Sequence, residues 1–246
     1  MVAISLTLMK MAVSAAPDSV LALPASMAET LIVGDALELG TGAPAYREEH
    51  QLRFDAGRLA AMRTVYRNPD GVTLAERTLD FSASASATRP DYSLKDIRDG
   101  YEEGASVQAG RVLVHSRASK DAVRKEKRLN VPAPYVIDGG FHPFMKENWD
   151  ELTKGKRVSF HFVVPSRLDY YRFVAYEEAA LAPAGGRYKV FVAVPENKLL
   201  RMLVEPIVAR YDVSSRRMLE YRGLSNINGA DGKTQKVRLA YREPGL

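Results

Sequence analysis

One short segment, residues 138–144 (DGGFHPF), combines a carboxylate, two glycines, an imidazole and two aromatic rings. Asp138 and His142 are the residue types of a general acid–base pair, and the segment could equally gate a ligand site. The same composition is also typical of a tight turn, in which glycine permits close geometry and the aromatic rings cover the end of a barrel. We favour the turn and keep the acid–base pair as the alternative.

Aromatic side chains form the second candidate site, because they gather on neighbouring predicted strands such as 170–176 and 187–194. Such rings line apolar pockets, and they also pair across strands inside a core. With the segment above and the helix that should follow it, they predict a ligand-binding set and no catalytic or metal-ligating residue. The set is Phe141, His142, Trp149, Phe160, Phe162, Tyr170, Tyr176 and Tyr188.

The common signatures of enzymes are missing from the sequence. It holds no G-x-S-x-G, H-E-x-x-H, Walker A or G-x-G-x-x-G motif. With no cysteine it has no thiol nucleophile and no thiolate metal site, and the four histidines lack the spacing of paired ligands. His50 and His161 fall on predicted strands, where we expect structural roles. We therefore expect no cofactor and no metal.

Charge and composition describe an ordinary globular chain of 246 residues, 46% hydrophobic and 26% charged, with a net charge of +5. Basic residues on the C-terminal strands could attract an anionic membrane surface, or could simply be a solvated strand face. No pattern for nucleic-acid recognition is present. The basic residues are Arg210, Arg216, Arg217, Arg222, Lys236, Arg238 and Arg242.

The elements that position these residues are mostly strands. From Tyr46 onward, segments with a period of two end in turn signals such as Asn68-Pro69-Asp70-Gly71, and about ten strands are expected. Helical spacing is confined to Pro143–Thr153, expected as one helix, and Pro195–Leu203. The fold class predicted is mainly β: an antiparallel meander that forms a strongly curved half-barrel or a closed barrel, with one or two short helices. A sandwich is the alternative.

The N-terminal 28 residues have another character. Small residues in Ser26-Met27-Ala28 fit a signal-peptidase site, although Asp18 interrupts the apolar stretch and Lys10 is the one early cation. We expect residues 1–28 to be a signal peptide or a disordered arm, and residues 29–246 to form a single β-barrel-like domain. The expected location is periplasmic, and otherwise cytoplasmic.

Five short motifs resemble a family of uncharacterised proteobacterial periplasmic or envelope proteins. The motifs are YREEH at 46–50, VYRNPDG at 65–71, DGGF at 138–141, VVPS at 163–166 and YRGLSNI at 221–227. That group is loosely similar to half-barrels that carry lipids or lipoproteins. The resemblance implies a periplasmic location and an apolar ligand, and it supplies no catalytic residue.

Together these observations predict an exported, non-enzymatic protein that binds an apolar or amphipathic small molecule such as a lipid. A structural or interaction module of the cell envelope with a filled core is the first alternative. An enzyme that uses Asp138 and His142 is the second.

Overall fold

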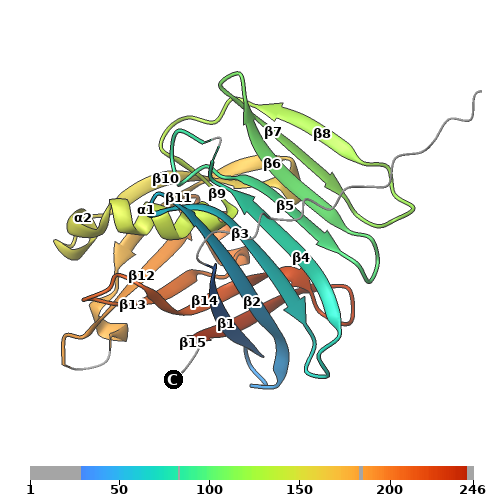
Figure 1. Cartoon of the computed structure of the whole chain (residues 1–246). Helices are drawn as coiled ribbons and strands as arrows, with labels where there is room; N and C mark the ends of the chain where they lie inside the picture. Colours follow the sequence, from blue (N-terminus) through green and yellow to red (C-terminus); the bar gives the residue numbers. More distant parts are fainter. Residues whose placement is uncertain (1–28, 83, 183–184, 243–246) are drawn as a thin grey trace, which may run out of the picture.

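A computed structural model describes residues 29–82, 84–182 and 185–242 (Figure 1). The predicted signal peptide or arm, 1–28, lies outside the described residues. Within them, fifteen strands form one sheet. The strands are β1 (Glu29–Glu38), β2 (Pro44–Asp55), β3 (Arg58–Arg67), β4 (Thr73–Asp80), β5 (Asp91–Asp96), β6 (Glu102–Gln108), β7 (Arg111–Arg117), β8 (Lys125–Leu129), β9 (Tyr135–Ile137), β10 (Val158–Val164), β11 (Asp169–Glu177), β12 (Tyr188–Pro195), β13 (Ile207–Asp212), β14 (Met218–Asn228) and β15 (Thr234–Arg242).

Short helices interrupt the sheet's meander between strands. The α-helices are α1 (Phe141–Glu147), α2 (Trp149–Thr153) and α3 (Lys198–Leu203), and the 3-10 turns are η1 (Asp138–Gly140), η2 (Pro165–Arg167) and η3 (Ala179–Leu181). No helix in the described part of the chain is long and apolar enough to cross a membrane.

The two ends of the described chain meet in the middle of the sheet. Strand β1 pairs antiparallel with both β2 and β15. From there the sheet runs outward to β8 on one side and to β9 on the other, with a parallel pair only between β9 and β10. Figure 1 shows β2–β4 and β12–β14 running in steeply different directions, as a strongly curved sheet requires. The predicted fold class, mainly β with a curved half-barrel, is confirmed.

Alternation along many of the strands separates the inside of the half-barrel from its outside. In β4, for example, Ala75 and Leu79 are buried, whereas Glu76 faces outward and pairs with Arg63 of β3. One large apolar cluster fills the side of β1–β8, with the fully buried Tyr66, Leu79 and Leu94 among its members. In β4 the period of two in the sequence therefore reports the two faces of the sheet correctly.

A second cluster packs α1 and α2 against β10–β13. Phe144 lies against Phe160 with ring centres 4.6 Å apart, and Trp149 meets Phe191 edge to face at 5.1 Å. Fully burying an aromatic or large aliphatic side chain contributes roughly 1.5–3 kcal/mol. The helices are held by this contact, since each is too short to be stable alone.

Two details of the predicted elements are wrong. The single helix expected over Pro143–Thr153 is two helices that meet at Asn148, whose side-chain amide donates to the Phe144 carbonyl at 2.9 Å and competes with the helical pattern. About ten strands were expected, whereas the described residues contain fifteen. Strand β8 has the charged sequence KEKRL and β9 has three residues, so neither shows a period of two.

The passage from β9 into α1 lies inside the half-barrel. The Ile137 amide donates to the Thr88 carbonyl at 3.0 Å. The backbone of Gly140 lies so close to Thr88 that a Cβ atom built at Gly140 would be 2.0 Å from the same carbonyl oxygen. At Gly139 the nearest atom to such a Cβ is the Cδ1 of Leu79, at 2.4 Å, which is the end of a flexible side chain.

We expect Gly140→Ala to lower the free energy of unfolding by about 2–3 kcal/mol or more, because the backbone at Thr88 must move. Gly139→Ala is the matched control, and it should cost less because Leu79 can change rotamer. Urea unfolding followed by circular dichroism measures both. Equal losses of unfolding free energy in the two variants would show that the backbone contact with Thr88 is no tighter than the contact with Leu79.

Candidate functional site

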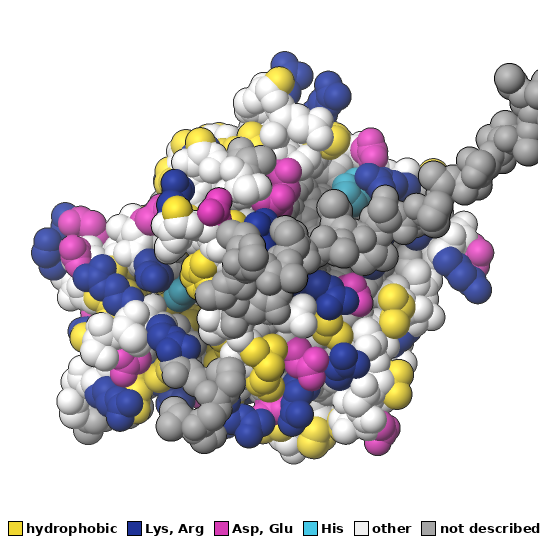
Figure 2. All heavy atoms as spheres, viewed as in Figure 1, with side chains coloured by type: hydrophobic (Ala, Val, Ile, Leu, Met, Phe, Trp, Pro, Cys, Tyr) yellow, Lys and Arg dark blue, Asp and Glu magenta, His cyan; other side chains and the backbone are white. Residues whose placement is uncertain are grey.

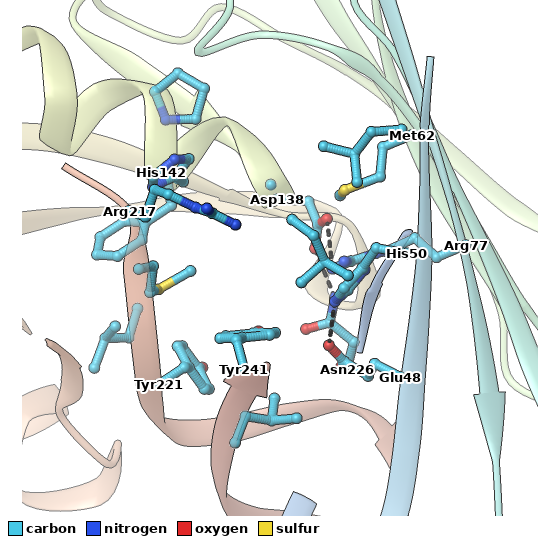
Figure 3. A pocket seen from close by; sticks show the side chains of 18 of the residues that line it. Glu48, His50, Met62, Arg77, Asp138, His142, Arg217, Tyr221, Asn226 and Tyr241 are labelled. Atoms are coloured by element: carbon cyan, nitrogen blue, oxygen red, sulfur yellow. Dashed lines mark hydrogen bonds and ion pairs between the residues drawn. The ribbon is translucent and has the colours of Figure 1, made fainter. Parts of the chain in front are cut away.

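A cavity of about 280 Å³ lies on the concave face of the sheet, between β1–β4, β13–β15 and the start of α1 (Figure 3). Most of its wall is apolar. Typical apolar lining residues are Ile32, Leu52, Met62, Phe162, Met218 and Leu239. The interior of the half-barrel is therefore not fully packed, and it leaves room for a small molecule.

One part of the wall is polar, and its side chains contact one another. Glu48 and His50, on β2, are 4% and 5% exposed, with the Glu48 Oε2 and His50 Nε2 atoms 3.0 Å apart. The Nδ1 atom of His50 lies 2.8 Å from the Thr64 hydroxyl of β3, which also accepts from the Arg77 guanidinium at 3.3 Å. These contacts join three adjacent strands by side chains as well as by backbone.

Arg77 continues the polar chain across the interior. Its Nη1 donates to Oδ2 of Asp138 at 3.1 Å, and the Asn226 amide of β14 donates to Oδ1 of the same carboxylate at 2.8 Å. Asp138 thereby connects β4 on one side of the half-barrel with β14 on the other. Figure 3 shows this group on one wall of the cavity, close to Glu48 and His50.

The network keeps its buried carboxylate ionised. Burial alone would raise the pKa of Glu48, but the hydrogen bond and charge of His50, and then the charge of Arg77, outweigh burial. The pKa of Glu48 is consequently lowered from its usual value. The wall presents paired charges, and this is how buried ionic groups avoid a large desolvation penalty.

Glu48, His50 and Thr64 have the order of a carboxylate, imidazole and hydroxyl relay. Thr64, however, is fully buried and does not line the cavity, and Arg77 donates to its oxygen. A substrate in the cavity could not reach this hydroxyl. The relay fixes the orientation of His50 and is not arranged for nucleophilic attack.

The opposite side of the cavity carries His142 and Arg217. The His142 ring stacks on Tyr211 with centres 5.6 Å apart and planes inclined by 8°, and its Nδ1 lies 3.4 Å from the Tyr211 hydroxyl. Burial, with a smaller effect from the Lys146 charge, lowers the pKa of His142 to about 4. His142 is therefore neutral at pH 7. The Arg217 side chain, next to His142, brings a positive charge into the cavity (Figure 3).

A second buried carboxylate lies outside this cavity. Glu103 of β6 accepts from the Tyr92 hydroxyl at 2.5 Å and from the Tyr101 hydroxyl at 2.7 Å. Burial raises the pKa of Glu103 in spite of these two hydrogen bonds. It does not line the cavity and faces tyrosines of the core, so we assign it a structural role.

The structure brings three of the eight predicted ligand-binding residues to the cavity: Phe141, His142 and Phe162. Trp149 and Phe160 are buried in the cluster around the helices. The other three lie elsewhere on the sheet: Tyr170 against His161, Tyr176 under Arg157, and Tyr188 beside Arg187 and Arg210.

Asp138 and His142, the proposed acid–base pair, both line the cavity but have separate partners. Asp138 is held by Arg77 and Asn226, and His142 by Tyr211. The sequence reasoning missed Glu48, Arg77 and Asn226. The signal that could have found them is an acidic or a basic side chain at an inward position of an otherwise apolar strand. His50, which was expected to be structural, belongs to the same wall.

Five of the seven basic residues predicted on the C-terminal strands are paired with carboxylates. Arg210 and Arg238 both pair with Glu220, at 3.4 and 3.3 Å, and Lys236 pairs with Glu205 at 2.7 Å. Arg216 contacts Asp150, and Arg242 contacts Asp35. On the face shown in Figure 2, acidic and basic side chains are interspersed. Among the described residues, no group of three or more His, Asp or Glu side chains is arranged to hold a metal ion.

Comparisons with known proteins give a structural similarity only. No protein-family model and no curated protein matches the chain. A crystal structure of a β-barrel-like protein of a domain of unknown function, DUF1849, from Brucella abortus is similar, with 8% sequence identity and a TM-score of 0.49. The similarity covers 88% of this chain and 97% of that one.

The Asp138 bridge makes a stability prediction. Asp138→Ala should lower the free energy of unfolding by at least about 3 kcal/mol, because it leaves the Arg77 charge buried without its partner. The control is Glu76→Ala, on the outer face of β4, the strand that carries Arg77. This substitution breaks the 2.6 Å contact between Glu76 and Arg63. Being exposed to solvent, that pair should contribute under about 1 kcal/mol. Similar losses in the two variants, in denaturant unfolding, would contradict the bridging role.

A second prediction concerns pH. The folded-state pKa of His142, about 4, lies below the usual 6.5, so the unfolded chain takes up a proton first as the pH falls. Stability should be lost between pH 6.5 and 4, by up to about 3 kcal/mol. His142→Leu should remove this loss, so the difference in unfolding free energy, wild type minus variant, should decrease as the pH is lowered from 6.5 to 4. A difference that is constant over this range would refute the half-buried, neutral imidazole.

Proposed function

We propose that the protein binds one small amphipathic anion, such as a medium-chain fatty acid, in the cavity on its concave face. The observation that carries the proposal is an apolar cavity with Arg217 extending into it (Figure 3). Apolar side chains would take the chain of the ligand, and the guanidinium would take its acidic group, because arginine binds carboxylate and phosphate with paired hydrogen bonds.

The size of the cavity supports a small ligand. About 280 Å³ lies just below the range typical of small-molecule sites, about 300–1,000 Å³. A long-chain lipid with two chains would not be enclosed. A single chain of moderate length, or one chain of a larger amphiphile, fits this volume better.

The polar wall supports binding more than catalysis. The Glu48, His50, Arg77 and Asp138 side chains already hydrogen-bond to each other or to neighbours. A wall whose polar side chains are held by such contacts is preorganised and can keep its shape around an apolar chain. We therefore propose a carrier or sensor role. We place it in the cell envelope on the pattern of residues 1–28 in the sequence.

Isothermal titration calorimetry with decanoate and with decanol tests the proposal. The wild type should bind one decanoate per chain, and more tightly than decanol. Arg217→Ala should weaken decanoate binding about tenfold or more and leave decanol unchanged, because a charge-assisted hydrogen bond contributes about 1.5–3 kcal/mol.

Arg222→Ala is the matched control, because Arg222 is an exposed arginine on β14, the strand that begins directly after Arg217, and it does not line the cavity. It should bind both ligands as the wild type does. Equal losses in the two arginine variants, or no difference between acid and alcohol in the wild type, would contradict a specific anion contact. Absence of binding of either compound would overturn the proposed function.

A further inference from the structure

Helix α3 (Lys198–Leu203) carries an exposed apolar surface. Leu199, Met202 and Leu203 are 73%, 83% and 82% exposed, and the helix buries none of its residues. A six-residue helix of this kind adds nothing to the core. Adjacent exposed apolar side chains mark an interaction surface more often than chance positions do.

The local structure holds the helix in place without covering it. The Asn197 side chain accepts hydrogen bonds from the Leu199 and Leu200 amides at 2.9 and 3.2 Å. Arg201 donates from its Nε to the Pro195 carbonyl at 3.1 Å. The cap and this contact fix α3 to the end of β12, so its apolar side chains are presented and not hidden.

The charge around α3 is positive. Glu196 and Glu205, which flank the helix, are each paired with a cation of a neighbouring strand: Arg172 at 3.0 Å and Lys236 at 2.7 Å. The helix contains no acidic residue, and its own cations are Lys198 and Arg201. The paired glutamates cannot offset these two charges as well, so the surface that complements α3 is anionic.

We propose that α3 docks the protein on an anionic lipid surface, inserting Leu199, Met202 and Leu203 at the level of the headgroups. Apolar side chains with adjacent lysine or arginine are the combination that binds such interfaces. A specific protein partner is less favoured on size, because stable complexes bury about 800 Å² on each side. Three side chains on a single short helix present much less.

The position of α3 connects this surface with the cavity. Ile207, the first residue of β13, lines the cavity, and only Val204, Glu205 and Pro206 separate it from Leu203. A docked helix would bring the lipid surface to the end of the strand that carries this lining residue. The docking proposal goes beyond the ligand site and does not require its occupancy.

Flotation of the purified chain with vesicles tests the docking. Phosphatidylglycerol vesicles should bind the wild type, and pure phosphatidylcholine vesicles should bind it several-fold less, because the cationic contribution is lost. Met202→Gln should reduce binding to the anionic vesicles about threefold or more. Val123→Gln is the matched control, because Val123 is 82% exposed but lies on the loop between β7 and β8. This variant should bind the vesicles as the wild type does.

Lys198→Glu should also reduce binding, and added salt should reduce it in the wild type. Equal binding to both vesicle types, or equal effects of the Met202 and Val123 substitutions, would overturn the proposal. Light scattering identifies the competing occupant: a wild-type dimer that Met202→Gln dissociates, without vesicle binding, would assign α3 to contact between copies. Decanoate titration of Met202→Gln should give the wild-type value, so failure of docking is distinguishable from failure of the cavity proposal.

Discussion

The half-barrel depends on one carboxylate in its interior. The edge strands β8 and β9 end the sheet without pairing to each other, so no strand pairing closes the half-barrel there. Asp138 supplies a connection through the middle, because it accepts from Arg77 of β4 and from Asn226 of β14. Tyr46 of β2 and Ser225 of β14 add a second contact, with their hydroxyl oxygens 2.9 Å apart. The curvature that creates the cavity is therefore tied by side chains.

This arrangement explains why a hydrophobic half-barrel contains charged groups. Each buried ion loses hydration, and the loss is tolerable only where partners and hydrogen bonds replace the water. Glu48, Arg77 and Asp138 are partners for one another, although the Arg77 Nε atom is buried without a hydrogen-bond partner, and removing one member would leave another unpaired. The groups on this wall hold the shape of the cavity, whereas Arg217, on the other side, brings charge toward a ligand (Figure 3).

Much of the fold was predictable because alternation survives in most strands. The sequence 158–164, for instance, shows the period of two directly, and it forms β10 (Val158–Val164). Strands β8 and β9 were missed since one is charged and the other is very short. The helix break was missed because Asn148 acts through a local hydrogen bond and not through the apolar pattern.

The site was predicted less well than the fold. Glu48, Arg77, Asp138 and Asn226 lie far apart in the sequence, and only the curvature of the sheet brings them together. The cluster of aromatic residues in the sequence predicted a pocket near Tyr170 and Tyr188. Aromatic side chains, however, also pair across neighbouring strands and stack under arginine side chains. Which face of a strand points inward depends on register, and a shift of one residue exchanges the faces.

The most direct test of the account is to locate the ligand by methionine methyl resonances. Met62 and Met218 line the cavity, Met145 is buried in the helix cluster, and Met202 is exposed on α3. With ¹³C-methyl methionine in the full chain, decanoate should shift the Met62 and Met218 signals to saturation at one equivalent and leave those of Met145 and Met202 in place. Shifts confined to Met202, or none at Met62 and Met218, would contradict a ligand site inside the half-barrel.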